Sequence, residues 1–328
     1  MPKAQAPNPR QAVLLADIGG TNTRVALASQ GIVAHDTIRR FANAGRSGLP
    51  EILSAYLAEM TGTTCAGACV AVAGPVQDGI AEMTNLDWTV TPDAIRAATG
   101  AATVAILNDL QAQGHALDRL APGRLRAVLP GAARPRSDTR LVIGVGTGFN
   151  AAPVHRTVTG LLVAACESGH VSLPVRTEAD LRLARYVEAA HGFAGVEDVL
   201  SGRGLEWLYR WAASEAGSPA DAAASEVMQH IAADTDPVAQ SAARIFVRLL
   251  GRVAGDLALH HLPFGGIYLV GGVARAFTPY LASLGFAEAF RDKGRFSAFL
   301  DDFPVSVIED DFAALEGCAS YLTAVMTD

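Results

Sequence analysis

A short turn between two apolar runs contains residue types that bind anions. The turn and the position before it hold Asp17, Gly19, Gly20, Thr21 and Asn22. Adjacent glycines let the backbone come close to a ligand and present its N–H groups to an anion. The Thr and Asn side chains add donors, and Asp17 could hold a metal ion or its waters beside phosphate oxygens. A plain hairpin with a tight turn is the open alternative.

Two further glycine turns follow apolar runs. Gly146, Thr147 and Gly148 come after the run 141–145, so a strand-turn-strand unit occurs twice and predicts a duplicated, two-lobed architecture. Gly271 and Gly272 come after the run 267–270 and predict a turn that opens a helix and suits a nucleotide. Neither the P-loop motif nor G-x-G-x-x-G fits the chain, which disfavours P-loop and Rossmann proteins.

An amide and a carboxylate, Asn108 and Asp109, end the apolar run 104–107. Strand ends of open α/β sheets are where ligands bind, so this pair is a candidate for chemistry on a substrate. Asp109 would be ionised at neutral pH and could accept a proton as a general base. Because Asn and Asp also cap helices well, spacing alone favours a helix cap.

Three more polar residues are candidates for binding a polyhydroxylated ligand. Glu167 and His170 are three positions apart and could face one cavity from a helix or a turn. A carboxylate accepts hydrogen bonds from adjacent hydroxyls, and a His can donate or accept. The Glu-x-x-His spacing also suits a metal-ligand pair, and a surface turn is the simplest alternative. Taken alone, the position of Glu197 predicts no more than an ordinary Glu flanking a helix.

Bulk composition favours a well-packed globular protein. Of 328 residues, 50% are apolar and 18% are charged, which argues against disorder. The net charge of −7 disfavours broad capture of nucleic acid. The four cysteines are scattered, so we expect neither a disulfide framework nor a structural zinc site.

The first ten residues are polar and contain three prolines, so we expect a flexible tail rather than a signal peptide. No apolar run is long enough to cross a bilayer. We therefore expect a cytoplasmic protein with no membrane partner.

The order of the predicted elements is typical of an α/β protein. Strands are predicted at 12–18, 23–29, 67–73, 103–107, 267–270 and 304–308. Helices are predicted at 49–61, 92–99, 179–190, 203–215, 236–261 and 275–284, and from residue 311 onward. A Pro- and Arg-rich loop is predicted around 133–138. The glycine turns and the Asn108-Asp109 pair then fall at strand ends.

Taken together, these motifs resemble the actin/hexokinase/Hsp70 superfamily and, within it, the bacterial ATP-dependent glucokinase family. The resemblance runs from about residue 12 to about residue 320 in unbroken order. It rests on the three glycine turns, Met83-Thr84-Asn85 with Trp88, Asn108-Asp109, Glu167-Ser168-Gly169-His170, Glu197-Asp198-Val199-Leu200-Ser201-Gly202, and Phe290 with Asp292-Lys293-Gly294-Arg295-Phe296.

The resemblance implies a two-lobed ribonuclease H-like, or actin-like ATPase, fold with mixed sheets flanked by helices. The implied domains are a tail at 1–10, a small domain at 11–118 plus 313–328, and a large domain at 119–312. The last helix would return to pack on the first domain.

The implied activity is ATP-dependent phosphorylation of the 6-hydroxyl of a hexose, with glucose as the leading substrate. Asp109 would be the base, and the sugar would be bound by Asn108, Asp109, Glu167, His170 and Glu197. ATP would contact the three glycine turns, Mg²⁺ would be held at Asp17, and the chain would form a homodimer. Another hexose, such as mannose or fructose, or polyphosphate as donor, stays open. A non-catalytic sugar sensor is the alternative of another class; a DNA-binding repressor is disfavoured because no helix-turn-helix extension precedes residue 11.

The sequence departs from the family pattern at four positions near these residues. The family usually has Gly-Glu-Gly-Gly-His where this chain has Cys166, Glu167, Ser168, Gly169 and His170. Phe149 and Asn150 also stand beside the second turn, where a small residue and then Gly are usual. These changes leave phosphoryl transfer intact but weaken the preference for glucose over another hexose.

Overall fold

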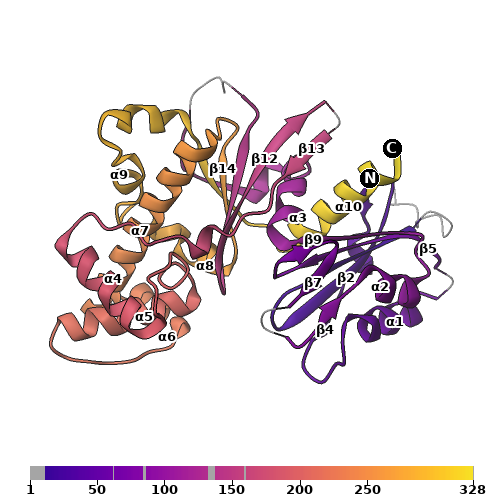
Figure 1. Cartoon of the computed structure of the whole chain (residues 1–328), viewed down its shortest axis with the longest axis horizontal. Helices are drawn as coiled ribbons and strands as arrows, with labels where there is room; N and C mark the ends of the chain where they lie inside the picture. Colours follow the sequence, from indigo (N-terminus) through magenta and orange to yellow (C-terminus); the bar gives the residue numbers. More distant parts are fainter. Residues whose placement is uncertain (1–11, 62, 84–85, 132–136, 159, 328) are drawn as a thin grey trace. The chain divides into compact units, whose positions relative to one another are not determined.

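The computed structural model describes residues 12–61, 63–83, 86–131, 137–158 and 160–327. The predicted tail at 1–10, the Thr84-Asn85 motif and most of the predicted loop at 133–138 lie outside these residues. The chain forms two compact units (Figure 1). Unit 1 contains the described parts of Met1–Ala121, Thr159–Val163 and Asp310–Asp328, and unit 2 contains those of Pro122–Val158 and Ala164–Glu309. The predicted division places 159–163 in the large domain, whereas contacts group this segment, which includes β13 (Gly160–Val163), with unit 1.

Unit 1 is built on a mixed sheet in the order β3-β2-β1-β5-β9, with β4 also pairing with β2. The strands are β1 (Ala12–Ile18), β2 (Asn22–Ser29), β3 (Ile32–Val33), β4 (Arg39–Ala42), β5 (Cys65–Val72) and β9 (Thr103–Asn108). The hairpin β1–β2 is antiparallel, and β5 and β9 continue the sheet in parallel. A separate small sheet contains β6 (Val76–Gln77), β7 (Ile80–Glu82) and β8 (Thr89–Val90).

Helices cover both faces of the unit 1 sheet because alternate strand residues point to opposite sides. Leu14 and Ile18 share a core with α1 (Leu49–Glu59) and α2 (Pro92–Thr99). Leu15 faces the other core, which contains side chains of α3 (Asp109–Ala116) and α10 (Ala313–Thr327). The C-terminal helix thus completes the core under α3.

Unit 2 repeats this arrangement. Five strands of its sheet run in the order β10-β15-β14-β11-β12, again with one antiparallel hairpin, β11–β12, and parallel neighbours β14 and β15. These strands are β10 (Leu125–Leu129), β11 (Arg140–Val145), β12 (Phe149–Thr157), β14 (Ile267–Val270) and β15 (Val305–Ile308). Its α-helices are α4 (Glu178–His191), α5 (Gly202–Glu215), α6 (Ala224–Ala233), α7 (Pro237–His261), α8 (Gly272–Phe277) and α9 (Phe286–Arg291).

Most predicted elements are confirmed to within a few residues, and one helix is wrong. The predicted helix at 275–284 begins earlier, as α8 at Gly272, and ends at Phe277. A 3-10 turn, Thr278–Tyr280, follows. Pro279 has no N–H to donate to the carbonyl one turn back, so it cannot continue the helix.

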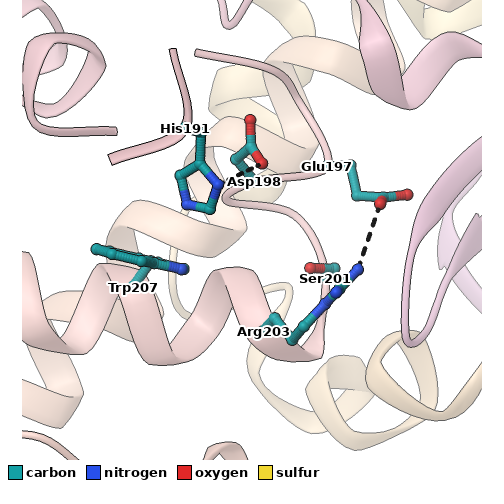
Figure 2. Close-up of a pocket in the computed structure, with 6 residues that line it drawn as sticks. All are labelled: His191, Glu197, Asp198, Ser201, Arg203 and Trp207. Carbon is teal, nitrogen blue, oxygen red and sulfur yellow. Dashed lines mark ion pairs between the residues drawn. The ribbon is translucent and has the colours of Figure 1, made fainter. Parts of the chain in front are cut away.

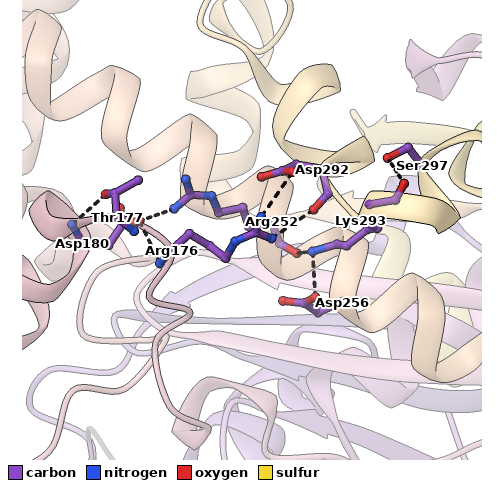
Figure 3. Close-up of polar contacts among 9 residues, drawn as sticks. Arg176, Thr177, Asp180, Arg252, Asp256, Asp292, Lys293 and Ser297 are labelled. Atoms are coloured by element: carbon purple, nitrogen blue, oxygen red, sulfur yellow. Dashed lines mark hydrogen bonds and ion pairs between the residues drawn. The ribbon is translucent and has the colours of Figure 1, made fainter.

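Charged side chains join the segment after α9 to α7, and α7 to α4 (Figure 3). Lys293 Nζ donates to Asp256 Oδ1 at 2.7 Å and to the Arg252 carbonyl at 3.0 Å. Arg252 is only 5% exposed and donates to Asp180 Oδ2 at 2.7 Å. Asp180 also accepts from the Thr177 N–H in a capping box. The motif at 292–296 therefore has a structural role within unit 2.

Hydrogen bonds stabilise the negative charge of Asp180 although the carboxyl is partly buried. Burial raises the pKa of this carboxyl, but hydrogen bonds from Arg252, Thr177 and the Arg176 N–H lower it by a larger amount, so its pKa lies below the usual value.

A membrane-spanning helix was looked for among the residues that the structure describes, and none of their helices combines the length and the apolar character that it would need.

Candidate active site

Two of the predicted site segments lie at one edge of the unit 1 sheet. In the parallel ladder, Ile18 pairs with Val72, and Val72 pairs with Asn108. The carboxyl ends of β1, β5 and β9 therefore coincide. The turn 19–22 and the Asn108-Asp109 pair both follow from this edge, where open α/β sheets bind ligands.

The first turn is organised by a buried side chain that the sequence analysis missed. Asn43, 3% exposed, donates from Nδ2 to the Gly19 carbonyl at 2.8 Å and accepts the Thr23 hydroxyl at 2.8 Å. Its N–H donates to the Thr21 carbonyl at 2.9 Å. No local motif marks Asn43, because its partners are about twenty residues earlier in the chain.

The turn leaves its tip available to a ligand. The Gly19 N–H donates to the Asn22 carbonyl at 3.0 Å and so closes the turn. Gly20 and Thr21 are exposed. An anion at this turn would therefore meet Gly20 and Thr21 rather than the N–H of Gly19.

Asp17, the predicted metal ligand, has a protein partner. Its Oδ2 accepts from Arg24 at 3.1 Å, across the β1–β2 ladder. Burial raises the pKa of Asp17, and Arg24 lowers it in part. Among the described residues, no group of three or more His, Cys, Asp or Glu could hold a metal ion. Any ion at Asp17 would thus need most of its ligands from elsewhere.

Asn108 caps α3, and Asp109 is the first residue of that helix. Asn108 Oδ1 accepts from the Leu110 N–H at 2.9 Å, and its Nδ2 donates to the Gly74 carbonyl at 3.0 Å. Gln111 completes a capping box through the Asn108 N–H. Asp109 is partly exposed and sits at a helix N-terminus, which stabilises its negative charge. The helix-cap interpretation and a functional carboxylate are thus both compatible with this geometry.

In unit 2, Glu197 supports the second turn. Its Oε2 accepts from the Phe149 N–H at 2.9 Å and lies 2.5 Å from where a Cβ on Gly148 would stand. The Gly146 N–H closes the turn on the Gly148 carbonyl at 2.9 Å, and the Gly202 N–H donates to the Gly146 carbonyl at 2.8 Å. Glu197 is therefore more than a residue flanking a helix.

Gly271 packs directly beneath this turn. Its φ is +105°, and a Cβ there would lie 2.4 Å from the Val145 carbonyl oxygen. Gly146 and Gly272, in contrast, have open space around a Cβ and no left-handed φ. The second and third glycine motifs are thus adjacent. Of Gly146, Gly271 and Gly272, only Gly271 has a backbone conformation and packing that require glycine.

The Glu167–His170 segment forms a 3-10 turn, Ser168–His170, beside the same hairpin. The Glu197 N–H donates to the Gly169 carbonyl at 2.9 Å. Glu167 and His170 are both exposed. Unit 2 therefore brings Glu167, His170 and Glu197 together with the second and third glycine turns.

A pocket opens beside Glu197 (Figure 2). It is lined by His191, Glu197, Asp198, Ser201, Arg203 and Trp207. Arg203, 73% exposed, reaches the Glu197 carboxylate at 3.7 Å. Apart from Glu197, none of these side chains is predicted from the sequence to bind a ligand.

The family model described as Glucokinase matches residues 14–325. The chain belongs to the glucokinase family. A glucokinase of Chromobacterium violaceum is 36% identical over 310 residues, which cover 94% of this chain and 88% of that protein. The matched range contains every predicted site residue.

Solved glucokinase structures share the fold. A glucokinase from an Antarctic psychrotroph has a TM-score of 0.83 and 30% identity, covering 95% of this chain and 98% of that one. A ROK family glucokinase from Streptomyces griseus, in complex with glucose and AMPPNP, has a TM-score of 0.63 at 21% identity over 94% of this chain and 98% of that one. The predicted α/β, actin-like ATPase fold of this glucokinase family member is confirmed.

Proposed function

We propose that this chain transfers the γ-phosphoryl group of ATP to the 6-hydroxyl of a hexose, with glucose as the preferred substrate. The observation that carries the proposal is the glucokinase match over residues 14–325, which includes all the candidate residues. The complex of the Streptomyces griseus protein with glucose and AMPPNP supports this pair of ligands.

The residues of unit 1 supply the base and one phosphate turn. Phosphoryl transfer needs an in-line nucleophile and charge stabilisation more than covalent help from the protein. Asp109 would orient the sugar 6-hydroxyl and accept its proton. Asn108, held by the capping box, would fix the helix start and hydrogen-bond the sugar. The tip of the first turn, Gly20 and Thr21 with the Asn22 side chain, would face a phosphate.

The residues of unit 2 supply further sugar contacts and the other nucleotide turns. Glu167, His170 and Glu197 would hydrogen-bond sugar hydroxyls, which act as donors and acceptors. Thr147 and Gly148 would approach phosphate, and Gly271 and Gly272 would approach the adenosine.

Magnesium fits Asp17 only as an ion held mostly by other ligands. Mg²⁺ usually takes one or two carboxylates and fills its other positions with phosphate oxygens and water. Asp17 would supply one such carboxylate, while Arg24 keeps it oriented. When bound, the ion would neutralise phosphate charge.

The proposal also includes the organisation of the chain. We infer two domains that act as the two lobes, at 11–118 plus 313–328 and at 119–312, with the segment 160–163 of the latter range grouped with the first by its contacts. We infer a homodimer in the cytoplasm that does not use nucleic acid or a membrane as partner. The acidic net charge of −7 supports the exclusion of nucleic acid.

The decisive experiment combines a substrate panel with Asp109→Asn. ADP release is measured with glucose, mannose and fructose, using ATP or polyphosphate as donor. Asp109→Asn should lower kcat by about 10²–10⁴, the span of a general base, while calorimetry finds sugar binding nearly unchanged. Glu167→Gln and His170→Ala should raise the sugar KM more than the ATP KM.

Each alternative predicts a different result. Sugar binding without turnover in the unmodified protein would indicate a sensor. A larger kcat/KM with another hexose, or with polyphosphate, would reassign the substrate or donor. Turnover of Asp109→Asn within tenfold of the parent would remove Asp109 from the mechanism.

A further inference from the structure

The Asn150 side chain makes four hydrogen bonds beside the turn of the hairpin β11–β12. Its Nδ2 donates to the Cys166 carbonyl at 2.5 Å and to Glu167 Oε2 at 3.2 Å. Its Oδ1 accepts from the Ser168 N–H at 2.9 Å and from the Ala151 N–H at 2.8 Å. An amide has two donor hydrogens and two acceptor lone pairs, so its capacity is used in full.

This pattern fixes the orientation of the amide. Both partners of Oδ1 are backbone N–H groups, and both partners of Nδ2 are oxygens. A rotated amide would oppose donors to donors and acceptors to acceptors, so only one orientation is compatible. The Asn150 amide is therefore a rigid support for the segment that starts at Cys166.

The backbone next to Glu167 is held from a second side. Gly169 is buried, and a Cβ there would lie 2.2 Å from the Phe149 carbonyl oxygen. The Gly169 carbonyl accepts from the Glu197 N–H. With Asn150 on one side and Glu197 on the other, the short turn has little freedom, although Glu167 itself is exposed.

We propose that Asn150 is a positioning residue for sugar binding: it holds the Glu167 carboxylate in the orientation that accepts hydrogen bonds from hexose hydroxyls. The proposal rests on the proposed function, because Glu167 is assigned there to the sugar. With Oε2 held by Asn150, the remaining acceptor sites of Glu167 face a substrate in a defined direction. The cost of ordering this side chain is then met before the sugar binds.

Two substitutions test the donor and acceptor groups of the Asn150 amide. Asn150→Asp keeps an acceptor for the Ser168 N–H, removes both donors and places a second carboxylate beside Glu167. Asn150→Ala removes all four bonds. His155→Ala, on the same strand and also half-buried, is the matched control. Melting curves of each variant identify any loss of fold.

We expect the sugar KM to rise about five- to tenfold in Asn150→Ala and more in Asn150→Asp, where the two carboxylates repel. The ATP KM and kcat should stay within twofold of the parent, and His155→Ala should change none of them. A structural role alone would instead lower kcat and the melting temperature together. An unchanged sugar KM in a folded Asn150→Asp variant would overturn the proposal.

A double-mutant cycle with Glu167→Gln decides whether Asn150 acts through Glu167. In the Glu167→Gln background, Asn150→Ala should change the sugar KM less than twofold, because the orientation of the carboxylate no longer contributes. Fully additive effects would overturn the proposal. Sugar affinities measured by calorimetry without ATP give the same comparison even if the parent shows no turnover, which would contradict the proposed function alone.

Discussion

The two hairpin turns have the same place in their sheets but are supported by different chemistry. In unit 1, the neutral side-chain amide of Asn43 is buried and binds the Gly19 carbonyl and the Thr23 hydroxyl, while the backbone N–H of Asn43 binds the Thr21 carbonyl. In unit 2, the charged carboxylate of Glu197 binds the turn through the Phe149 N–H. Glu197 is 26% exposed in its side chain and is also a proposed sugar residue.

The difference shows how structural support and ligand binding can be divided. In unit 1, the residue that holds the turn is separate from the proposed base, Asp109. In unit 2, one side chain is assigned both tasks. Changes in the first turn should therefore affect the nucleotide without the sugar, whereas changes at Glu197 should affect the sugar even when the fold is kept.

The largest expected effect comes from Gly271→Val, which targets the packing beneath the unit 2 turn. Strain at φ +105° and the clash with the Val145 carbonyl oxygen each cost about 1–3 kcal/mol, so unit 2 should lose about 2–6 kcal/mol. Gly19→Ala is the matched control in unit 1, because its nearest atom is the Asn22 carbonyl oxygen at 3.4 Å.

Trp fluorescence can assign the loss to a unit when the tryptophans of the other unit are replaced by Phe. Trp88 lies in unit 1, and Trp207 and Trp211 lie in unit 2. In Gly271→Val, denaturation followed by the unit 2 tryptophans should move to lower denaturant concentration. A normal midpoint in that variant would show that the backbone tolerates Val and that the close packing of Gly271 has little weight.

The second prediction separates the units along the pH axis. His115 of unit 1 is 6% exposed and packs against Tyr321, and burial lowers its pKa from 6.5 to about 4. The unfolded chain binds this proton first, so stability is full above pH 6.5 and falls by about 3 kcal/mol as the pH drops to 4. The pKa of Asp180 in unit 2 is lowered from 3.8, so its contribution is lost only below that pH.

Burial also lowers the pKa of His261 in unit 2, so unit 2 should lose some stability below pH 6.5 as well. Because the shift at His115 is large, the midpoint of Trp88 should fall further than that of Trp207 and Trp211. His115→Phe, which keeps an aromatic contact for Tyr321, should flatten the unit 1 response between pH 6.5 and 4. If the midpoints of both units fall over the same pH range in the parent and in this variant, His115 is not the source of the effect.

These contrasts also show what the sequence could and could not predict. Apolar periodicity located both hairpins and the long helix α7, because strand and helix spacing are local properties. Asn43 and Asn150 were different: each acts through partners up to about twenty residues away, and neither is part of a turn motif. Asn150 was noted only as a departure from the family pattern. The left-handed φ of Gly271 became meaningful only once Val145 was placed above it.

The third prediction compares the two supports directly. Asn43→Ala removes partners from the part-buried Gly19 carbonyl and the buried Thr23 hydroxyl, at about 1–3 kcal/mol for each unsatisfied group. Unit 1 should be destabilised by at least about 2 kcal/mol, with a higher ATP KM. Glu197→Gln keeps an oxygen for the Phe149 N–H, so unit 2 should lose less than about 1 kcal/mol.

For Glu197→Gln the main consequence should be a sugar KM at least tenfold higher at nearly unchanged ATP KM. The fluorescence midpoints and the two KM values test both halves of the comparison in one set of experiments. A sugar defect in Asn43→Ala that equals its ATP defect, with unit 1 still folded, would contradict the separation of roles in unit 1.

The smallest effect on stability is expected at Gly146 and Gly272, the two glycines with open space around a Cβ. Because neither has a left-handed φ and no neighbour lies within 4 Å, Gly146→Ala and Gly272→Ala should change the unit 2 midpoint by less than about 1 kcal/mol. The space around them in the protein is where a nucleotide would approach. A methyl group there should therefore raise the Kd for ATP several-fold while sugar binding to the free enzyme stays the same. Calorimetric titration of each ligand measures both, and unchanged ATP affinity in both variants would remove these turns from the nucleotide site.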